Sequence, residues 1–458
     1  MLLRERFAMS AFAGDPAPPA PLTWGQQALW TELRRRGPEQ ATISLRRVVA
    51  LRRGATPEAV VRAISALVSR HSSLRTHLRV VDGEPRQVVS ASGELPVLMY
   101  DAESGNAAAE AETVARRLAA EPFDHAAELP QRFALVLDTS TEKSYVVVVF
   151  SHTTVDFRAI ELLLRELRLL IVRGQLASPP GPQSVDIARR EDGPERYRSE
   201  RAVAYWLDGF GRLPHDTLPR LAEPASPRFR RTELVSAATG PAVALAARRC
   251  RVTTSAVLLA AVAAVMSVRS GADVAGLHVM AANRVLDDYE HAVAKLNQIA
   301  LVVADATGRP GFDGLVARVW PAAVRGYRHA HYDPSAVQRA FDRAGFPYRT
   351  GVNPHCYFND IRLAPDAAPH TPATTERDLR EAPSTCTVTD EFDHFFWRVR
   401  VQIFDAPGGL GIALTGDTAH LPPIEAERFL RELERLLVAA AFRDVPWPWK
   451  PEHLEPQR

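Results

Sequence analysis

The chain has 458 residues, of which 46% are hydrophobic and 24% charged, a balance typical of folded globular proteins that excludes wholesale disorder. At about 150 residues per domain, a chain of this length predicts two large domains or three ordinary ones. The formal net charge is only +2 at pH 7, because 56 basic residues nearly balance 54 acidic ones. A protein that works mainly by neutralising phosphates needs a larger positive excess, so nucleic acid is excluded as the principal partner.

The positions of the cysteines and of the apolar runs indicate the cellular compartment of the protein. Cys250, Cys356 and Cys386 lie far apart without a CxxC pair, which favours a reduced cytosol over a disulfide framework or a thiolate zinc site. Charged residues at positions 4 to 6 interrupt the apolar N-terminal stretch, so no signal peptide is expected. The longest apolar run, 256–266, is much shorter than the roughly 20 residues of a membrane span. We therefore expect a soluble, cytoplasmic protein without a membrane partner.

The first half of the chain predicts a helix, a buried strand and a second helix. Thr56 and Pro57 suit the N-cap and first position of a helix, and apolar residues then recur at helical spacing. The run SYVVVVF at 144–150 is typical of a strand buried on both faces. Apolar residues at helical spacing over 160–171 predict a long amphipathic helix. The short loop between this strand and helix is a place where functional residues often lie.

The second half repeats this mixture. Proline-rich stretches at 178–183 and 213–228 place a domain boundary between them. After them we expect, in chain order, a nearly all-apolar helix at 255–267, strands at 274–282 and 299–303, a hairpin of 396–404 with 410–415, and a helix at 424–440. The fold class is therefore α/β, with two lobes and mixed sheets. We assign the lobes to 20–180 and 185–445, with flexible tails at 1–19 and 446–458.

The densest polar cluster, SHTTVD at 151–156, directly follows the buried strand. A serine hydrolase triad is disfavoured, because Ser151 and His152 are neighbours whose side chains tend to point to opposite faces of a strand, and no GxSxG motif occurs. Asp156 has a structural interpretation as the N-cap of the next helix, worth about 0.5–2 kcal/mol. His152 is either a hydrogen-bonded histidine at a strand end or a catalytic group, and the pattern alone leaves both open.

No metal or cofactor site is predicted. His329 and His331 are two residues apart, but no carboxylate or cysteine accompanies them at metal-site spacing. Neither a glycine-rich phosphate loop nor a dinucleotide fingerprint is present. We expect no metal and no cofactor of the protein's own.

The polar cluster, extended to Phe157, resembles the HHxxxDG signature of the condensation domains of nonribosomal peptide synthetases. Further segments resemble that family's other blocks, in the family's order, and Asn297 is shared with it; together they extend over about residues 20–440. These segments are PLTWGQQALW at 21–30, RHSSLRTHL at 70–78, EPFDHAAELPQRFALV at 121–136, AANR at 281–284, RHAHYDPSAV at 328–337, VNPHCYFND at 352–360 and DEFDHFF at 390–396.

The resemblance implies two chloramphenicol-acetyltransferase-like lobes arranged in a V, with an active-site tunnel between them. The phosphopantetheine arms of carrier proteins would enter this tunnel from two faces. His152 takes the position of the family's general base or orienting histidine, which suits an imidazole at neutral pH. Asp156 and Arg284 take the positions of a structural, buried ion pair that supports the site. Asn359, at the end of an apolar strand, either faces the tunnel or begins a turn.

Two residues depart from the family signature. Ser151 replaces its first histidine, a position less critical for chemistry. Phe157 replaces its glycine, which leaves room for backbone and substrate to approach closely. A phenyl ring at that point narrows, reshapes or blocks the acceptor channel. We therefore count Ser151, Phe157 and Asn359 as candidates for tunnel-facing or substrate-facing positions.

The resemblance predicts a free-standing condensation enzyme of natural-product and antibiotic biosynthesis. It would transfer an acyl or aminoacyl group from the phosphopantetheine thioester of a peptidyl or acyl carrier protein. The acceptor would be a small-molecule amine or alcohol, or a second carrier protein, and no covalent acyl-enzyme would form. One alternative is a degenerate domain that docks a carrier protein and recruits a tailoring enzyme. Another is an acyltransferase that uses coenzyme A as donor.

Overall fold

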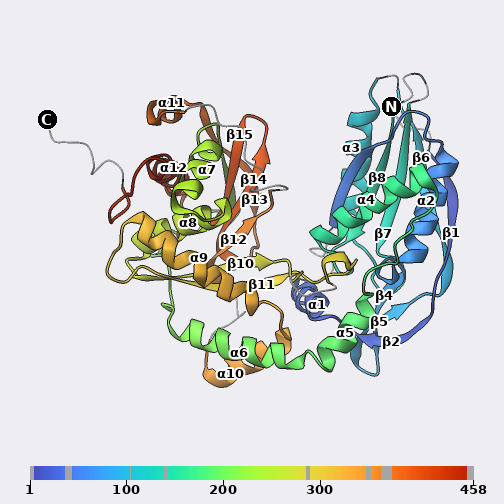
Figure 1. Cartoon of the computed structure of the whole chain (residues 1–458), viewed down its shortest axis with the longest axis horizontal. Coiled ribbons are helices and arrows are strands. Elements are labelled where there is room, and N and C mark those ends of the chain that lie inside the picture. The colour runs from blue at the N-terminus through green and yellow to red at the C-terminus, as the bar shows by residue number, and fades with distance from the viewer. Residues whose placement is uncertain are drawn as a thin grey trace. The chain divides into compact units, whose positions relative to one another are not determined.

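A computed structural model describes residues 5–36, 44–103, 105–138, 140, 143–284, 289–346, 352–362 and 374–450. It consists of two compact units (Figure 1). The first contains Met1–Ser199 and Ala282–Gln298, and the second contains Glu200–Ala281 and Ile299–Arg458. Each unit contains helices together with parallel and antiparallel strands, so the predicted mixture of α and β structure is confirmed.

The described strands of the first unit form two sheets. A five-stranded sheet has the order β1-β6-β7-β8-β3, and a three-stranded sheet has the order β2-β5-β4. In the larger sheet β6 and β7 are parallel and the other pairs antiparallel. In chain order the strands are β1 (Glu5–Ala13), β2 (Ala17–Pro21), β3 (Ser44–Ala50), β4 (Thr76–Val81), β5 (Glu84–Val89), β6 (Ser92–Asp101), β7 (Gln131–Asp138) and β8 (Lys143–Ser151).

Helices cover both faces of the five-stranded sheet. Val146 and Val148 of β8 pack in one apolar cluster with α2 and α4, whereas Val147 and Val149 pack in another with α3. This arrangement confirms the prediction of a strand buried on both faces. The helices of this unit are α1 (Trp24–Arg36), α2 (Pro57–Arg70), the 3-10 helix η2 (Ser72–Arg75), α3 (Ala107–Ala120), α4 (Phe157–Arg173), α5 (Ser184–Asp192) and the 3-10 helix η3 (Tyr289–His291).

The predicted flexible tails differ from the structure at both ends. Strand β1 pairs along its length with β6, and Ser10 and Phe12 are buried, so the expectation of a flexible segment over 1–19 was wrong for this strand. At the other end, Trp449 is buried in the core of the second unit and its Nε1 donates a hydrogen bond to the Pro310 carbonyl at 3.0 Å. Residues 1–4 and 451–458 of the predicted tails lie outside the described residues.

The second unit is built on a seven-stranded sheet of order β11-β10-β12-β14-β15-β9-β13. The expected hairpin is confirmed, since β14 and β15 pair antiparallel. The strands are β9 (Phe229–Ser236), β10 (Val274–Ala281), β11 (Gln298–Asp305), β12 (Asn353–Asp360), β13 (Ser384–Phe392), β14 (Trp397–Ala406) and β15 (Gly409–Asp417). The helices are α6 (Arg196–Gly211, which begins in the first unit), α7 (Thr239–Cys250), α8 (Thr254–Ser270), α9 (Phe312–Arg328), α10 (Pro334–Ala344), α11 (Glu376–Glu381) and α12 (Pro423–Ala440).

The nearly all-apolar composition of helix α8 is explained by its position in the core. Every residue from Ala256 to Ser267 is buried, because α8 packs against α7, α9, α12 and the sheet. A helix that is apolar on all sides is typical of the centre of a large core. Among the described residues no single helix is long and apolar enough to cross a membrane, and only the pair α7 and α8, bent by 100°, reaches that length together.

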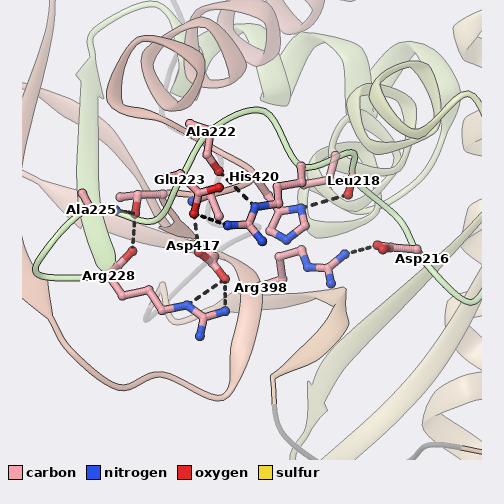
Figure 2. A network of polar contacts seen from close by, with 12 residues as sticks. Asp216, Leu218, Ala222, Glu223, Ala225, Arg228, Arg398, Asp417 and His420 are labelled. Atoms are coloured by element: carbon pink, nitrogen blue, oxygen red, sulfur yellow. Dashed lines mark hydrogen bonds and ion pairs between the residues drawn. The ribbon is translucent and has the colours of Figure 1, made fainter.

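Polar contacts hold the proline-rich connection over 213–228 against other parts of the second unit, to which it belongs (Figure 2). Arg228 donates from Nε and Nη2 to Asp417 Oδ2 at 3.1 and 2.7 Å. His420 Nδ1 donates to the Leu218 carbonyl at 3.0 Å, and Arg398 forms an ion pair with Asp216. The connection is therefore ordered by side chains of β14, β15 and the turn that follows β15.

Two segments expected in the second lobe belong to the first unit. These are residues 185–199, which include nearly all of α5, and residues 282–298; both stretches fall within the predicted range 185–445. The Thr23 hydroxyl donates to the Lys295 carbonyl at 2.9 Å, and Trp24 N donates to Glu191 Oε2 at 2.7 Å. Because these bonds join residues far apart in the chain, sequence position alone could not reveal them.

Candidate active site

The polar cluster lies in the first unit, in the short loop between β8 and α4. Asp156 is the N-cap of α4, as the sequence predicted, and its Oδ1 accepts a hydrogen bond from Ala159 N at 2.9 Å. The side chains of Asp156 and Val155 are buried, whereas His152 is half-buried. The loop is therefore held at its end by a capping carboxylate, and its histidine is the more accessible group.

The predicted ion pair between Asp156 and Arg284 is present. Arg284 Nη2 donates to Asp156 Oδ1 at 2.7 Å, and the two side chains are only 8% and 2% exposed. The other carboxylate oxygen accepts from the backbone N–H groups of Leu296 and Asn297, at 3.0 and 3.2 Å. Although burial favours the neutral acid, the charge of Arg284 and these hydrogen bonds hold the pKa of Asp156 below its usual value. Asp156 is thus an ionised structural group whose hydrogen-bonding capacity is in use.

Arg284 holds the segment that crosses back into the first unit. Besides Asp156, it donates to the carbonyls of Tyr289 and Ala292 through Nη1, at 2.8 and 2.6 Å, and to that of Ala294 through Nη2, at 3.2 Å. A planar guanidinium with several donors can bridge a carboxylate and a curved backbone in this way. One side chain therefore joins the Asp156 carboxylate to the backbone of residues 289–294.

His152 has a defined tautomer. Its Nδ1 lies 2.8 Å from the Val155 carbonyl oxygen, which can only accept, so Nδ1 carries the proton and Nε2 keeps its lone pair. Burial and the nearby charge of Lys295 lower the pKa of His152 to about 4. The imidazole is therefore neutral at neutral pH and presents Nε2 as an acceptor. No described residue forms a hydrogen bond with Nε2.

Lys295 is a second cation in the same region. Its side chain is 5% exposed, and Nζ donates to the Asn297 carbonyl at 2.5 Å. Burial lowers the pKa of Lys295 to about 8, although the Asp156 carboxylate opposes this shift. Since Asp156 already pairs with Arg284, the site contains two basic side chains and one carboxylate among these three residues.

Ser151 takes no part in a pair with His152. Its hydroxyl lies 2.8 Å from Thr153 Oγ1 and 3.4 Å from His125 Nε2. Ser151 and His152 thus have separate partners, as expected for neighbouring residues that do not form a hydrolase triad. The side chain of Ser151 is 1% exposed, so it acts as a buried connection between β8 and the loop.

Phe157 begins α4 and is half-buried. The guanidinium carbon of Arg47, on β3, lies 4.7 Å from the centroid of its ring. Arg47 also reaches Glu161 of α4, at 3.4 Å. The ring that stands where the family signature has glycine is therefore positioned by a cation–π contact.

Asn359 belongs to the second unit. It lies on β12, in register with Gln402 of β14, and is partly exposed. Its neighbours Cys356 and Phe358 face the apolar core, so the alternation of a strand puts Asn359 on the opposite face. It is part of the strand and not the first residue of a turn.

A model of the condensation domain family matches residues 19–441, nearly the whole chain. The chain belongs to the condensation domain family. The resemblance predicted from separate motifs is thereby confirmed.

Relatives of this condensation domain include large synthetases. It is 30% identical over 204 residues to phosphinothricin tripeptide synthetase PhsC of Streptomyces viridochromogenes, covering 42% of this chain and 18% of that protein. It is 24% identical over 487 aligned positions to AMB antimetabolite synthetase AmbB of Pseudomonas aeruginosa, covering 98% of this chain and 37% of that protein. The chain therefore spans well under half the length of these two relatives.

Solved structures share the fold. The condensation domain of the monacolin K polyketide synthase MokA superposes with a TM-score of 0.71 at 15% identity, covering 94% of this chain and 99% of that one. The X-domain from teicoplanin biosynthesis, solved in complex with OxyB, has a TM-score of 0.68 at 18% identity, with coverages of 94% and 95%. A starter condensation domain of rhizomide synthetase RzmA, solved with C8-CoA, has a TM-score of 0.69 at 14% identity, with coverages of 93% and 95%. The predicted chloramphenicol-acetyltransferase-like fold, which is that of condensation domains, is confirmed.

Sequence reasoning missed two residues of the site, Lys295 and His125. Lys295 is one of only three lysines in the chain and stands between Ala294 and Leu296 in an apolar segment. An isolated lysine in such a segment is a signal of a buried charge. His125 lies in a block that resembled the family, but its closeness to Ser151 depends on how β7 and β8 pair. The described residues contain no group of three or more His, Cys, Asp and Glu side chains arranged to hold a metal ion.

Proposed function

We propose that this condensation domain transfers an acyl or aminoacyl group from a phosphopantetheine thioester on a carrier protein to an amine or hydroxyl, forming an amide or an ester. The observation that carries the proposal is the state of His152. Because Nδ1 donates its proton to the Val155 carbonyl, Nε2 keeps a lone pair, and no described residue forms a hydrogen bond with it. Family membership supplies the class of reaction, and this geometry supplies the acceptor for a proton.

Acyl transfer needs no covalent catalysis by the protein, because a thioester is already activated toward attack by a nucleophile. The acceptor nitrogen or oxygen attacks the thioester carbonyl, the new C–N or C–O bond forms, and the C–S bond breaks. The proton lost by the nucleophile passes to His152 Nε2 and then to the departing thiolate. No acyl-enzyme is formed, and the atoms balance without a further reactant.

Burial and the charge of Lys295 lower the pKa of His152, which makes the imidazole a weak base. A weakly basic imidazole does not remove a proton from a free amine, but it accepts a hydrogen bond that orients the nucleophile. Once attack has made the nitrogen positively charged, its proton is acidic enough to be transferred. Asp156 is not the base, because both its oxygens are occupied by hydrogen bonds.

The test is intact-protein mass spectrometry of an acyl-loaded carrier protein incubated with candidate amines and alcohols. We expect loss of the acyl group with appearance of the matching product, and at least a roughly tenfold lower rate for His152→Ala. Thr154→Ala, which alters a buried side chain in the same loop, serves as the control for changes in packing. A rate for His152→Ala equal to that of the unaltered chain, at equal melting temperature, excludes a catalytic role for His152.

A second function is supported by Phe157. In this reading the domain docks a carrier protein and recruits a tailoring enzyme without transferring the acyl group. The X-domain solved with OxyB shares the fold, and Phe157 departs from the glycine of the signature. A carrier that binds but keeps its acyl group with every acceptor favours this function over transfer.

The acyl donor is tested in the same experiment. The RzmA starter domain was solved with C8-CoA, so an acyl-CoA is supplied in place of the loaded carrier in a parallel reaction. We expect transfer from the carrier to be faster, since the near-neutral chain has only +2 formal charge to attract the phosphates of coenzyme A. Faster transfer from acyl-CoA identifies a CoA-dependent acyltransferase.

A further inference from the structure

One face of the seven-stranded sheet in the second unit carries a row of polar side chains. In β14, Val399 and Val401 face the apolar core, so the alternation of the strand places Arg400 on the other face. Arg400 is in register with Tyr357 of β12 on one side and with Thr415 of β15 on the other. Residues in register on neighbouring strands lie side by side on the same face.

The row continues to a second arginine. Thr415 is in register with Arg231 of β9. Arg231 Nη1 donates to Gln402 Oε1 at 3.1 Å, and Arg400 Nη2 donates to the same oxygen. Two guanidinium groups thus converge on a single neutral acceptor, an arrangement that like charges oppose.

The two arginines differ in how their charges are balanced. Arg231 forms an ion pair with Glu233 at 2.7 Å, and Asp390 lies 4.0 Å away. Arg400 forms no ion pair with any described residue, and its Nε is buried without a hydrogen-bond partner among them. Burial lowers the pKa of Arg400, and the charge of Arg231 adds to the effect. A half-buried cation without a counterion can gain stability from an anionic ligand, because partial burial strengthens the attraction between opposite charges.

The surroundings of Arg400 suit the binding of an oxyanion, such as a carboxylate or a phosphate. A guanidinium offers five N–H donors in a fixed plane, and here one of them serves Gln402. Tyr357 stacks on Trp397 with ring centroids 5.1 Å apart, so its ring is held in place. Burial raises the pKa of Tyr357 to about 12, and the hydroxyl therefore remains a donor at neutral pH. A planar cation beside a neutral hydroxyl donor is typical of carboxylate and phosphate recognition.

We propose that Arg400, with Arg231 and Tyr357, forms a binding site for the carboxylate or phosphate group of a small ligand on this face of the second unit. The proposal does not depend on acyl transfer by the His152 loop, because it concerns binding to one unit by itself. A carboxylate would come from a substrate, and a phosphate from a phosphopantetheine arm or a nucleotide.

The test is isothermal titration calorimetry of the full chain with two probes, succinate and inorganic phosphate, at constant ionic strength set with chloride. We expect saturable binding of at least one probe, weakened about tenfold or more in Arg400→Gln, because a charge-assisted hydrogen bond is lost. Arg328→Gln is the matched control, since Arg328 is an exposed arginine of α9 in the same unit and the change in charge is identical. Its affinity is expected to equal that of the unaltered chain.

Arg400→Lys keeps the charge but loses the planar donor set, and we expect intermediate affinity. It also maintains the test if Arg400→Gln fails to fold. Binding of succinate alone assigns a carboxylate ligand, and binding of phosphate alone assigns a phosphate ligand. Saturation by neither probe, or equal affinity in the unaltered chain and in a folded Arg400 variant, overturns the proposal.

Discussion

Arg284 has a buried side chain and Arg400 is half-buried, and their charges are balanced in different ways. Arg284 has the Asp156 carboxylate at 2.7 Å and three backbone carbonyls around it. Arg400 shares one amide oxygen with another arginine and has no acidic partner among the described residues. The first charge is a component of the fold, whereas the second has no counterion among the described residues, which is the basis of the proposed ligand site. Substitutions that remove each charge should separate these two roles.

Loss of the Asp156 carboxylate should have the largest effect. Asp156→Ala leaves Arg284 buried without its counterion and removes the cap of α4, which we expect to destabilise the protein by about 3–5 kcal/mol. Asp101→Ala is the control, because Asp101 pairs with Arg6 on the surface, at 39% and 54% exposure. That exposed pair should contribute about 0–1 kcal/mol. Chemical denaturation measures both, and equal losses would show that the buried pair is not structural.

The same carboxylate should give a pH dependence of stability. The pKa of Asp156 is lower in the folded chain than its usual value, so its contribution is present above the pKa of the unfolded state. It is lost as the pH falls through the folded pKa. Denaturation of the unaltered chain between neutral and strongly acidic pH should therefore show a decline that is smaller in Asp156→Ala.

A substitution of Lys295 tests how this second buried cation affects the pKa of His152. In Lys295→Met the charge that helps to keep His152 neutral is absent, so the pKa of His152 should rise from about 4. A protonated imidazole cannot accept a proton, and the acidic limb of the pH–rate profile should move to higher pH. At about pH 8 the rate should change by no more than about twofold. Lys143→Met, which alters an exposed lysine, should leave the profile in place.

Phe157 should have a smaller effect on stability. Phe157→Gly removes the cation–π contact with Arg47 and increases the freedom of the unfolded chain, which together should cost about 1 kcal/mol. If the ring narrows the acceptor channel, the rate of transfer should rise in this variant. A lower rate at unchanged affinity for the carrier would instead show that the ring shapes the site for its acceptor. Arg47→Gln removes the cation–π contact but keeps the Phe157 ring, so it separates the effect of the contact from the effect of the ring.

Arg400→Gln should have the smallest effect on stability. Because this substitution breaks no ion pair and removes only the hydrogen bond to Gln402, we expect a change of about 1 kcal/mol or less, and in either direction. Melting temperature and chemical denaturation measure it beside Asp156→Ala. A loss as large as that of Asp156→Ala would contradict the contrast between the two arginines.

The loop after β8 shows how far the sequence could lead. The N-cap role of Asp156, the buried strand before it and the amphipathic helix after it follow from local patterns. The pair with Arg284 was predicted only through the family resemblance, because 128 residues separate the two in the chain. Lys295 was not predicted at all, since nothing local shows that residues 282–298 fold back onto the first unit.

Strand β1, near the N-terminus, was missed for a similar reason. Residues 5–13 have no strong alternation, and β1 forms because β6 offers it a pairing edge. Asn359 was predicted either to face a functional surface or to begin a turn. Only the register of β12 with β14 put it beside Gln402 and on the same face as Arg400.

Local patterns in the sequence indicated the class of fold, several helices and buried strands, and His152 and Asp156 as residues of interest, because periodicity and capping act between residues that are near in the chain. The family was predicted from the resemblance of several motifs taken together, and the family match confirmed it. Tertiary structure decided which nitrogen of His152 is free, which cations lack counterions, and which segments belong to each unit. Those properties depend on hydrogen bonds and charges between residues far apart in sequence, and their energies exist only once the chain is folded.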